Sequence, residues 1–427
     1  MTIQEIYNIY LKHPVVTTDS RNCPDGSIFI ALKGDSFNGN LFAKQAIEKG
    51  CAYAFVDEQV YADGNRILYV DDCLTMLQKL ANWHRRQLTI PIIGITGTNG
   101  KTTTKELTSA VLASKFNVLF TQGNLNNHIG VPLTLLKINK QHEIAVIEMG
   151  ANHQGEIKFL SEIAEPNFGL ITNVGKAHLE GFGSFEGVIK TKTELYEFVK
   201  RTNSTLFIHN ENPYLMPKAK GISQILYGET DGLFVSGKMV ANNPYLSFEW
   251  SHDGNQHFVQ TQLIGGYNLM NALAATAIGL NFGVTPKDVC AAIEEYTPQN
   301  NRSQLTKTER NSLVVDAYNA NPSSMLVAIT NFGEMQVESK VMILGDMREL
   351  GESSEMEHQK VVDLISTFTF DDVLLCGEHF GKTKHNFKSF ANTDLLIEFL
   401  QKQQIENSCV LIKGSRGMRL EKCIPLF

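Results

Sequence analysis

The sequence predicts an α/β protein built from three domains, and three observations support this prediction. Short apolar runs alternate with segments of helical period from about residue 90 onward, the pattern of parallel sheets covered by helices on both faces. A glycine-rich loop lies between one of these runs and a helical segment. The chain has 427 residues, which is too long for a single hydrophobic core.

The predicted strands are continuous apolar runs, and their length and flanking glycines favour strands over buried helical segments. These strands are expected at residues 90–96, 143–148, 168–172, 312–316, 340–344, 372–376 and 409–413. A more alternating stretch, residues 233–263, contains the turn signals Asn243-Pro244 and Asp253-Gly254. It predicts an antiparallel hairpin region within the middle of the chain.

Two polar stretches indicate domain boundaries. Residues 83–87 precede the first apolar strand, and residues 297–303 follow a helical pattern that ends at Pro298. We therefore expect three domains, at residues 1–88, 89–301 and 302–427.

Composition and charge exclude several classes of protein. The net charge of −7 argues against a general nucleic-acid-binding surface. The start of the chain lacks the apolar core of a signal peptide, and no run approaches the roughly 18 apolar residues of a membrane span. The seven cysteines form no C-x-x-C pair, which favours reduced thiols over disulfides or a zinc site. We expect a soluble cytoplasmic monomer with no nucleic-acid partner and no membrane span.

The strongest local pattern is the loop at residues 94–104, Gly-Ile-Thr-Gly-Thr-Asn-Gly-Lys-Thr-Thr-Thr. It follows an apolar strand and precedes a helical segment predicted at residues 105–112, which is the context of a phosphate-binding loop. Lys101 would neutralise the β- and γ-phosphates, and Thr102 would ligate Mg²⁺. Ile95 stands where the general pattern has glycine, so a simple glycine-rich turn with a surface lysine is the alternative. The expected nucleotide-binding residues are Gly97, Thr98, Asn99, Gly100, Lys101, Thr102 and Thr103.

Other candidates stand at strand ends and helix starts. Glu148 ends an apolar strand, where a carboxylate would face the phosphate loop, although it could also lie in solvent. Asn268 and Asn271 are spaced to share one helix face, and Asn268 could be only an N-cap. Arg302 follows the second boundary, and Asp316 ends a strand of the third domain.

The loop variant T-G-T-N-G-K-T-T resembles that of the Mur ligases and their relatives the folylpolyglutamate synthetases. Further segments resemble the Mur ligases in order along nearly the whole chain, namely residues 19–21 with 25–35, 173–183, 267–272, 316–322, 344–351, and 413–416 with Met418 and Glu421. The last three resemble the members that add D-alanyl-D-alanine, and the D-N-P-R pattern of the diamino-acid-adding members is absent.

This resemblance implies a UDP-substrate α/β domain at the N-terminus, a central P-loop ATPase domain with a parallel sheet, and a C-terminal Rossmann-like domain. It implies an ATP-dependent ligase that activates the carboxylate of UDP-N-acetylmuramoyl-tripeptide as an acyl phosphate. D-alanyl-D-alanine would then attack to give a pentapeptide precursor of peptidoglycan, with ADP and phosphate released.

The resemblance also implies residue roles. Lys101, Glu148, His178 and Lys192 would be catalytic. Two Mg²⁺ ions would be held by Thr102, Glu148, His178 and a carbamylated Lys192, for which Lys190 is a rival. Asn268 and Asn271 would contact adenine. Arg302 would contact the γ-phosphate, and Asp316 would contact the ribose. Substrate-binding candidates are Ser20 and Arg21 for the nucleotide end, Asn124, Asn126 and Asn127 for the muramoyl peptide, and Asn319, Asn321, Lys413 and Arg416 for the dipeptide.

Two other functions are compatible with the phosphate loop. A folate ligase would begin directly with the ATPase domain, and the N-terminal segment counts against it. A P-loop switch would usually carry Asp for magnesium at the strand end that Glu148 occupies. Phosphate release that depends on an amine acceptor would distinguish a ligase from a switch.

Overall fold

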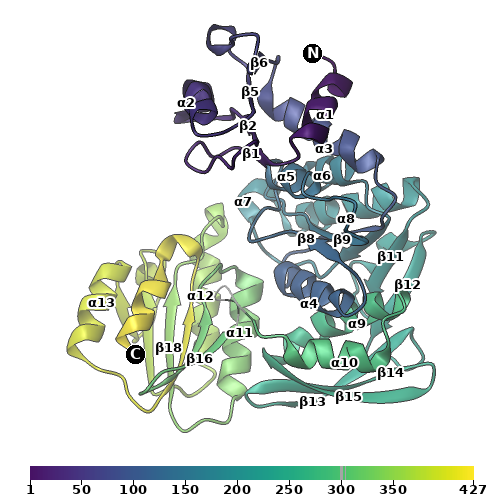
Figure 1. Cartoon of the computed structure of the whole chain (residues 1–427). Coiled ribbons are helices and arrows are strands. Elements are labelled where there is room, and N and C mark those ends of the chain that lie inside the picture. The colour runs from purple at the N-terminus through teal and green to yellow at the C-terminus, as the bar shows by residue number, and fades with distance from the viewer. Residues whose placement is uncertain (299–301, 303) are drawn as a thin grey trace.

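The computed structural model describes residues 1–298, 302 and 304–427. Figure 1 shows three α/β domains, with the N-terminal domain at the top, the central domain on the right and the C-terminal domain on the left. Each domain is organised around its own mainly parallel sheet, so the predicted fold class is confirmed. Among the described residues, no helix is long and apolar enough to cross a membrane.

The N-terminal domain contains a small parallel sheet in the order β1-β2-β5-β6. Its helix α1 begins with a capping box, in which the Thr2 hydroxyl accepts a hydrogen bond from the amide of Glu5 and the Glu5 carboxylate accepts one from the amide of Thr2. The elements are α1 (Ile3–Lys12), β1 (Val16–Thr17), β2 (Ile28–Ile30), β3 (Lys33–Gly34), β4 (Phe37–Asn38), α2 (Ala43–Glu48), β5 (Tyr53–Val56), β6 (Ile67–Tyr69) and α3 (Cys73–Arg86).

The central domain has a sheet of nine strands in the order β15-β14-β13-β12-β11-β10-β7-β9-β8. The strands from β13 to β8 pair parallel, whereas β14 pairs antiparallel with both β13 and β15. Its strands are β7 (Ile92–Thr96), β8 (Val118–Phe120), β9 (Ile144–Glu148), β10 (Phe168–Ile171), β11 (Thr205–His209), β12 (Ser223–Gly228), β13 (Val235–Asn242), β14 (Tyr245–His252) and β15 (Asn255–Ile264). Its helices are α4 (Lys101–Ala113), α5 (Gly130–Leu135), α6 (Glu156–Ala164), α7 (Leu179–Phe182), α8 (Phe185–Arg201), α9 (Leu269–Asn281) and α10 (Pro286–Glu295).

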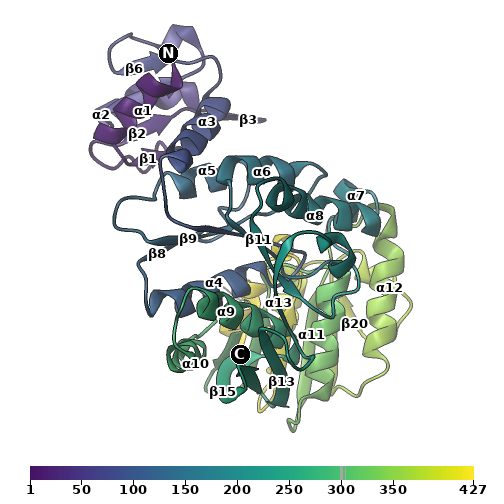
Figure 2. The same ribbon diagram turned by 90° about the vertical axis from the view of Figure 1, so that its right-hand side faces the viewer.

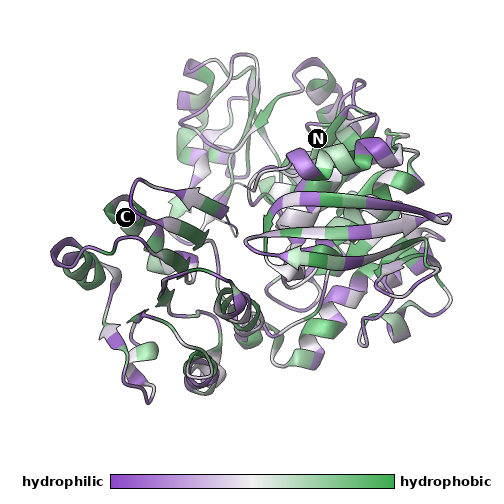
Figure 3. Cartoon of the chain, turned by 90° about the horizontal axis from the view of Figure 1, so that it is seen from below, coloured by the Kyte–Doolittle hydropathy of each residue, from purple (hydrophilic) through white to green (hydrophobic). Residues whose placement is uncertain are grey.

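The hairpin region predicted at residues 233–263 is confirmed as β13, β14 and β15. Both turns fall at the expected signals, because Asn243-Pro244 separates β13 from β14 and Asp253-Gly254 separates β14 from β15. The region is an edge extension of the main sheet rather than a separate unit. Polar and apolar residues alternate along these strands (Figure 3), since one face packs on the core and the other meets solvent.

The C-terminal domain is a six-stranded sheet in the order β16-β17-β21-β18-β19-β20, parallel except for the edge pair β16-β17. The elements are β16 (Gln304–Lys307), β17 (Ser312–Asp316), α11 (Pro322–Glu334), β18 (Lys340–Gly345), α12 (Ser354–Ile365), β19 (Asp372–Cys376), β20 (Lys388–Phe390), α13 (Thr393–Lys402) and β21 (Cys409–Lys413).

The predicted strands all occur, and three coincide with β17, β19 and β21 to the residue. The predicted boundary at residue 88 falls between α3 and β7, and each sheet lies inside one predicted segment. The boundary at residue 301 lies outside the described residues, so the exact limits of the domains stay predictions. The helix before that boundary ends at Glu295 rather than at Pro298.

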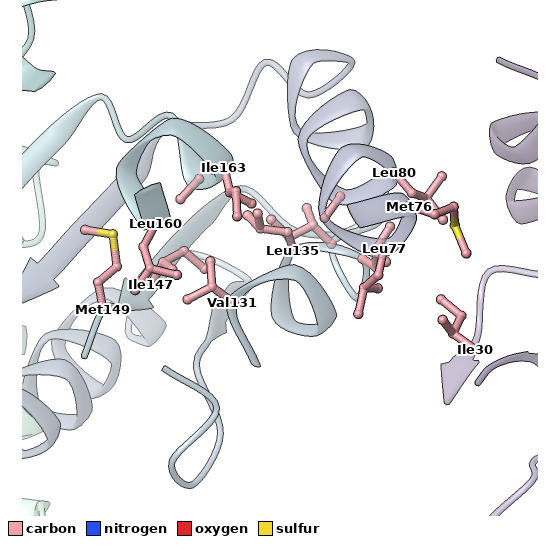
Figure 4. Close-up of a cluster of buried hydrophobic side chains, with 14 of the residues drawn as sticks. Ile30, Met76, Leu77, Leu80, Val131, Leu135, Ile147, Met149, Leu160 and Ile163 are labelled. Atoms are coloured by element: carbon pink, nitrogen blue, oxygen red, sulfur yellow. The ribbon is translucent and has the colours of Figure 1, made fainter. Parts of the chain in front are cut away.

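The N-terminal and central domains share one apolar core. Figure 4 follows it from Ile30 in the N-terminal domain, through Leu77 of α3, to Leu135 of α5. In the turned view of Figure 2, α5 and α6 lie directly beneath the N-terminal domain. The central and C-terminal domains, by contrast, are joined by polar contacts, including Asn321 to Asn99 and Asn242 to Asn331, and by Ile264, which packs into the apolar core of the C-terminal domain.

Candidate active site

The phosphate loop connects β7 to α4 in a conformation that requires glycine. Gly97 and Gly100 have φ values of 147° and 76°, in the region that side chains disfavour. A Cβ atom at Gly97 would lie 2.0 Å from the hydroxyl oxygen of Thr172. Helix α4 begins at Lys101, so the prediction that it starts at residue 105 is wrong. Because the helix starts at the loop, the amides of its first turn face the place expected for phosphate.

Lys101 folds back onto the loop. Its ammonium group donates hydrogen bonds to the carbonyl oxygens of Gly97 at 2.8 Å and Thr98 at 2.9 Å. Burial lowers the pKa of Lys101 to about 8, against the opposing charge of Glu148 and with a further lowering by Arg302. A buried ammonium group with a lowered pKa is stabilised by an incoming anion, which fits a phosphate ligand.

The segment after β10 supports the loop from the other side. The side chain of Asn173 accepts from the amide of Asn99 at 3.0 Å and donates to its carbonyl at 3.0 Å. Thr98 accepts a hydrogen bond at 3.0 Å from the amide of Gly175. These bonds fix the loop before any ligand arrives, which reduces the ordering needed on binding.

Glu148 ends β9 beside the loop and is 1% exposed, so the alternative of a carboxylate in solvent is wrong. One carboxylate oxygen accepts from the Thr102 hydroxyl at 3.0 Å, and the other accepts from the amide of Asn126 at 2.7 Å. Hydroxyl and carboxylate oxygens are the ligands that Mg²⁺ prefers. The pair Thr102 and Glu148 therefore fits a magnesium ion that is also held by phosphate oxygens.

A cavity of about 670 Å³ lies between the central and C-terminal domains and opens onto the phosphate loop. Most of the residues predicted from sequence line it. They are Thr98, Asn99, Gly100, Lys101, Thr102, Thr103, Asn124, Asn126, Asn127, Glu148, His178, Asn268, Asn271, Arg302, Asp316, Asn319, Asn321 and Lys413. The predicted residues that do not line it are Gly97, Lys192, Ser20, Arg21 and Arg416.

Asn268 and Asn271 lie side by side at the start of α9, as their spacing predicted. The Asn268 amide donates to the Ile264 carbonyl at 2.8 Å and accepts from Asn271 at 2.8 Å. Asn271 in turn accepts a hydrogen bond from Thr104 at 3.0 Å. Asn268 occupies the N-cap position of α9, but its side chain makes no capping hydrogen bond, so capping alone does not account for this asparagine.

The C-terminal domain contributes an ion pair to the cavity. The Lys413 ammonium lies 2.6 Å from a carboxylate oxygen of Asp316 and 3.2 Å from the carbonyl oxygen of Asn319. Lys413 is 1% exposed, so it neutralises and orients Asp316. Asn321 crosses to the other domain and donates to the side-chain oxygen of Asn99 at 2.8 Å.

His178 faces the C-terminal domain. Its Nδ1 atom pairs with the carboxylate of Glu349, and this pairing holds the pKa of Glu349 below its ordinary value. Nearby, Lys176 forms an ion pair with Glu357 at 3.0 Å. Within the described part of the chain, no group of three or more His, Cys, Asp or Glu side chains is arranged to hold a metal ion. The role of His178 as a metal ligand stays a prediction.

The two rival lysines on α8 differ in environment. Lys190 is exposed, whereas Lys192 is 2% exposed and its ammonium lies 5.4 Å from the centre of the Phe182 ring. Burial, together with the charge of Lys101, lowers the pKa of Lys192 well below its ordinary value, although Glu156 and Glu194 oppose the shift. This direction favours the neutral amine that carbamylation requires.

The remaining predicted residues lie outside the cavity. Arg21 is exposed and pairs with Asp19 at 2.9 Å, and the Ser20 carbonyl accepts from Lys49 at 2.8 Å. Arg416 lies beside the cavity, with its guanidinium carbon 5.4 Å from the centre of the Tyr318 ring.

Sequence reasoning missed several residues that line the cavity. Tyr267 and Tyr318 lie inside segments that carried the family resemblance, so those segments were the available signal. Glu156 at the start of α6 and Ser323 at the start of α11 had no local signal. Ser323 accepts a hydrogen bond from the amide of Lys176 at 2.8 Å and so joins the two domains.

Comparison with known families gives three matches that together span most of the chain. The family described as "Mur ligase family, catalytic domain" matches residues 14–85, "Mur ligase middle domain" matches residues 95–279, and "Mur ligase, glutamate ligase domain" matches residues 301–416.

Curated relatives match over nearly their full length. The UDP-N-acetylmuramoyl-tripeptide--D-alanyl-D-alanine ligase of Bacillus subtilis is 35% identical over 425 residues, which cover 96% of this chain and 92% of the relative. The ligase of the same name from Escherichia coli is 34% identical over 424 residues, with the same coverage of each chain.

Solved structures are similar in fold. A crystal structure of MurF from Acinetobacter baumannii has a TM-score of 0.89 at 31% identity and covers 99% of this chain and 98% of its own. The structure of MurF ligase from Thermotoga maritima in complex with ADP has a TM-score of 0.87 at 26% identity, covering 98% and 97%.

Proposed function

The chain belongs to the Mur ligase family, and on that premise we propose that it joins D-alanyl-D-alanine to UDP-N-acetylmuramoyl-tripeptide at the expense of ATP. The product is the pentapeptide precursor of peptidoglycan, and ADP and phosphate are released. The observation that carries this function is that the phosphate loop and Glu148 line the same cavity as the Asp316–Lys413 pair of the C-terminal domain.

Amide formation in water requires the carboxylate oxygen to become a leaving group. Transfer of the γ-phosphoryl group of ATP to the acceptor carboxylate gives an acyl phosphate, and the amine of the dipeptide then displaces phosphate. For this chemistry the protein mainly has to position the reactants and neutralise the charge on the phosphates. The cavity is suited to both tasks, since Lys101, Arg302 and the residues of the phosphate loop line it.

Magnesium would be held by Thr102 and Glu148, with the cation neutralising charge on the phosphates. Asn126 orients Glu148 through the hydrogen bond at 2.7 Å. Asp316, fixed by Lys413, would bind the ribose, and Asn268 and Asn271 would contact adenine. Lys101 would exchange its loop carbonyl partners for phosphate oxygens.

Lys192 is the proposed carbamylation site. Its neutral amine would add CO₂ and release a proton, which converts a buried lysine into a carboxylate-like ligand for a second magnesium ion. Burial of Lys192 and exposure of Lys190 support this choice.

Substrate binding is assigned to surfaces outside the nucleotide site. The N-terminal domain, with Ser20 and Arg21, would bind the UDP end, and Asn124 and Asn127 the muramoyl peptide. Asn319, Asn321 and Arg416 would contact the dipeptide. We place the protein in the cytoplasm as a monomer, divided into domains at residues 1–88, 89–301 and 302–427.

The test is a mixture of the protein with ATP, Mg²⁺ and UDP-N-acetylmuramoyl-tripeptide, with and without D-alanyl-D-alanine. Phosphate release that requires the dipeptide, together with a pentapeptide product identified by mass, is the expected result. Release that is equal without the dipeptide would indicate a simple ATPase. Absence of release with both the lysine and the diaminopimelate form of the tripeptide would remove this substrate assignment.

A further inference from the structure

The side chain of Arg302 lies against an aromatic ring of the C-terminal domain. Its guanidinium carbon is 3.7 Å from the centre of the Tyr318 ring, well inside the distance at which a planar cation and an aromatic face attract each other. Tyr318 follows β17 by two residues, whereas Arg302 precedes β16. The Nε atom of Arg302 is buried with no hydrogen-bond partner among the described residues. The Tyr318 ring, rather than a hydrogen bond at Nε, therefore sets the plane of the guanidinium.

Arg302 and Tyr318 both line the cavity that contains the phosphate loop. Arg302 is close enough to Lys101 for its charge to lower the lysine pKa. Two like charges would separate if their side chains were free to do so, because a long arginine side chain has many rotamers. Contact with the Tyr318 ring therefore keeps Arg302 near Lys101 before the phosphates arrive.

We propose that Tyr318 is a positioning residue that holds Arg302 over the γ-phosphate site. This inference rests on the proposed function, in which Arg302 neutralises the transferring phosphoryl group. Because Arg302 and Tyr318 both fall within the segment 302–427, docking of the C-terminal domain on the phosphate loop and placement of the arginine become one event. Tyr318 thereby couples domain closure to the charge state of the ATP site, without itself touching the reacting atoms.

The contact depends on the ring face and not on the hydroxyl group, which separates two substitutions at one position. Tyr318→Leu should lower kcat about tenfold, the scale of a partly desolvated cation–π contact, with a smaller change in the KM for the UDP substrate. Tyr318→Phe should restore most of kcat. Tyr214→Leu, at a tyrosine that is 46% exposed and does not line the cavity, serves as a control that should leave kcat unchanged.

A double-variant cycle distinguishes positioning from a general structural role. In an Arg302→Ala background, Tyr318→Leu should cause no further loss of kcat, because the ring acts through the arginine. Multiplicative losses in the double variant would overturn the proposal. Equal losses in Tyr318→Phe and Tyr318→Leu would overturn it as well, since they would assign the effect to the hydroxyl group.

Nucleotide affinity gives a second measurement that does not need the acceptor substrates. The ratio of AMP-PNP affinity to ADP affinity reports contacts to the γ-phosphate. It should fall in Tyr318→Leu and in Arg302→Ala to a similar extent, and should be kept in Tyr318→Phe. An unchanged ratio in Tyr318→Leu would contradict the proposal even in an active enzyme. If the wild-type chain releases no phosphate in response to the dipeptide, the proposed function fails while this ratio still tests the positioning role.

Discussion

Replacing Glu148 by glutamine removes a charge while keeping the shape of the side chain. The glutamine oxygen can accept from Asn126 and its amide can donate to Thr102, so both hydrogen bonds of the carboxylate persist. Glu148 is 1% exposed, and solvent does little to screen its charge. The variant should therefore fold with an unchanged or slightly raised unfolding temperature, because it no longer buries an anion.

The expected loss in Glu148→Gln lies in catalysis. Thr102 and Glu148 are 3.0 Å apart, so a cation ligated by Thr102 lies close to the carboxylate. Unit charges roughly 4 Å apart at an effective dielectric constant of about 20 interact by about 4 kcal/mol. If that interaction is expressed in the transition state, kcat/KM falls about a thousandfold, since each 1.36 kcal/mol is about tenfold in rate.

The assay for Glu148→Gln is dipeptide-dependent phosphate release across a range of Mg²⁺ concentrations. The matched control is Glu143→Gln, at the residue just before β9, where the side chain is exposed and accepts from the amide of Asn117. That control should retain wild-type kcat. A rate for Glu148→Gln within tenfold of wild type at saturating Mg²⁺ would refute the assignment of Glu148 as a magnesium ligand.

Three further predictions concern buried groups. Lys192→Ala should lower activity by at least about a hundredfold and should abolish any ¹³C carbamate resonance formed from labelled bicarbonate. Lys190→Ala should keep the activity and the resonance, whereas loss of both in Lys190→Ala alone would move the carbamylation site to Lys190. Lys413→Met leaves Asp316 without its partner and should lower the free energy of unfolding of the C-terminal domain in urea by about 3 kcal/mol, and adding Asp316→Asn should restore part of that stability. A decrease of less than about 1 kcal/mol would show that the pair is weak. Burial lowers the pKa of His84 from 6.5, so the unfolded chain binds a proton more readily than the folded chain, and stability should fall as the pH drops below 6.5. In His84→Gln the unfolding temperature should depend less on pH between 6.5 and 5, and a pH dependence equal to that of the wild type would contradict this.

The parallel strands were the easiest part of the fold to predict from sequence. Strands β17, β19 and β21 are buried on both faces along their central positions, and those three positions are apolar in each strand, so a short apolar run marks each strand. The strands of the N-terminal sheet have only two to four residues, which is too short for a periodic pattern. The start of α4 was misplaced because residues 101–104 are polar, and the left-handed Gly100 rather than periodicity determines where the helix begins.

The candidate site was predictable where one segment carries the chemistry. The phosphate loop, Glu148 at its strand end and the asparagine pair of α9 are local patterns, and the structure brings them to one cavity. Contacts between distant segments, in contrast, could not be predicted from a local sequence pattern. The partner of His178 is Glu349, which lies in another domain, and the stacking of Tyr318 on Arg302 joins a residue before β16 to one after β17.

The central claim is that the acceptor carboxylate is activated as an acyl phosphate. UDP-N-acetylmuramoyl-tripeptide labelled with ¹⁸O in its terminal carboxylate tests it most directly, because amine attack breaks the bond between the carbonyl carbon and the bridging oxygen. The account predicts that each phosphate released with product carries one ¹⁸O atom from the carboxylate, measured by mass spectrometry. Pentapeptide formation with unlabelled phosphate would contradict it, since phosphate would then arise by attack of water on ATP.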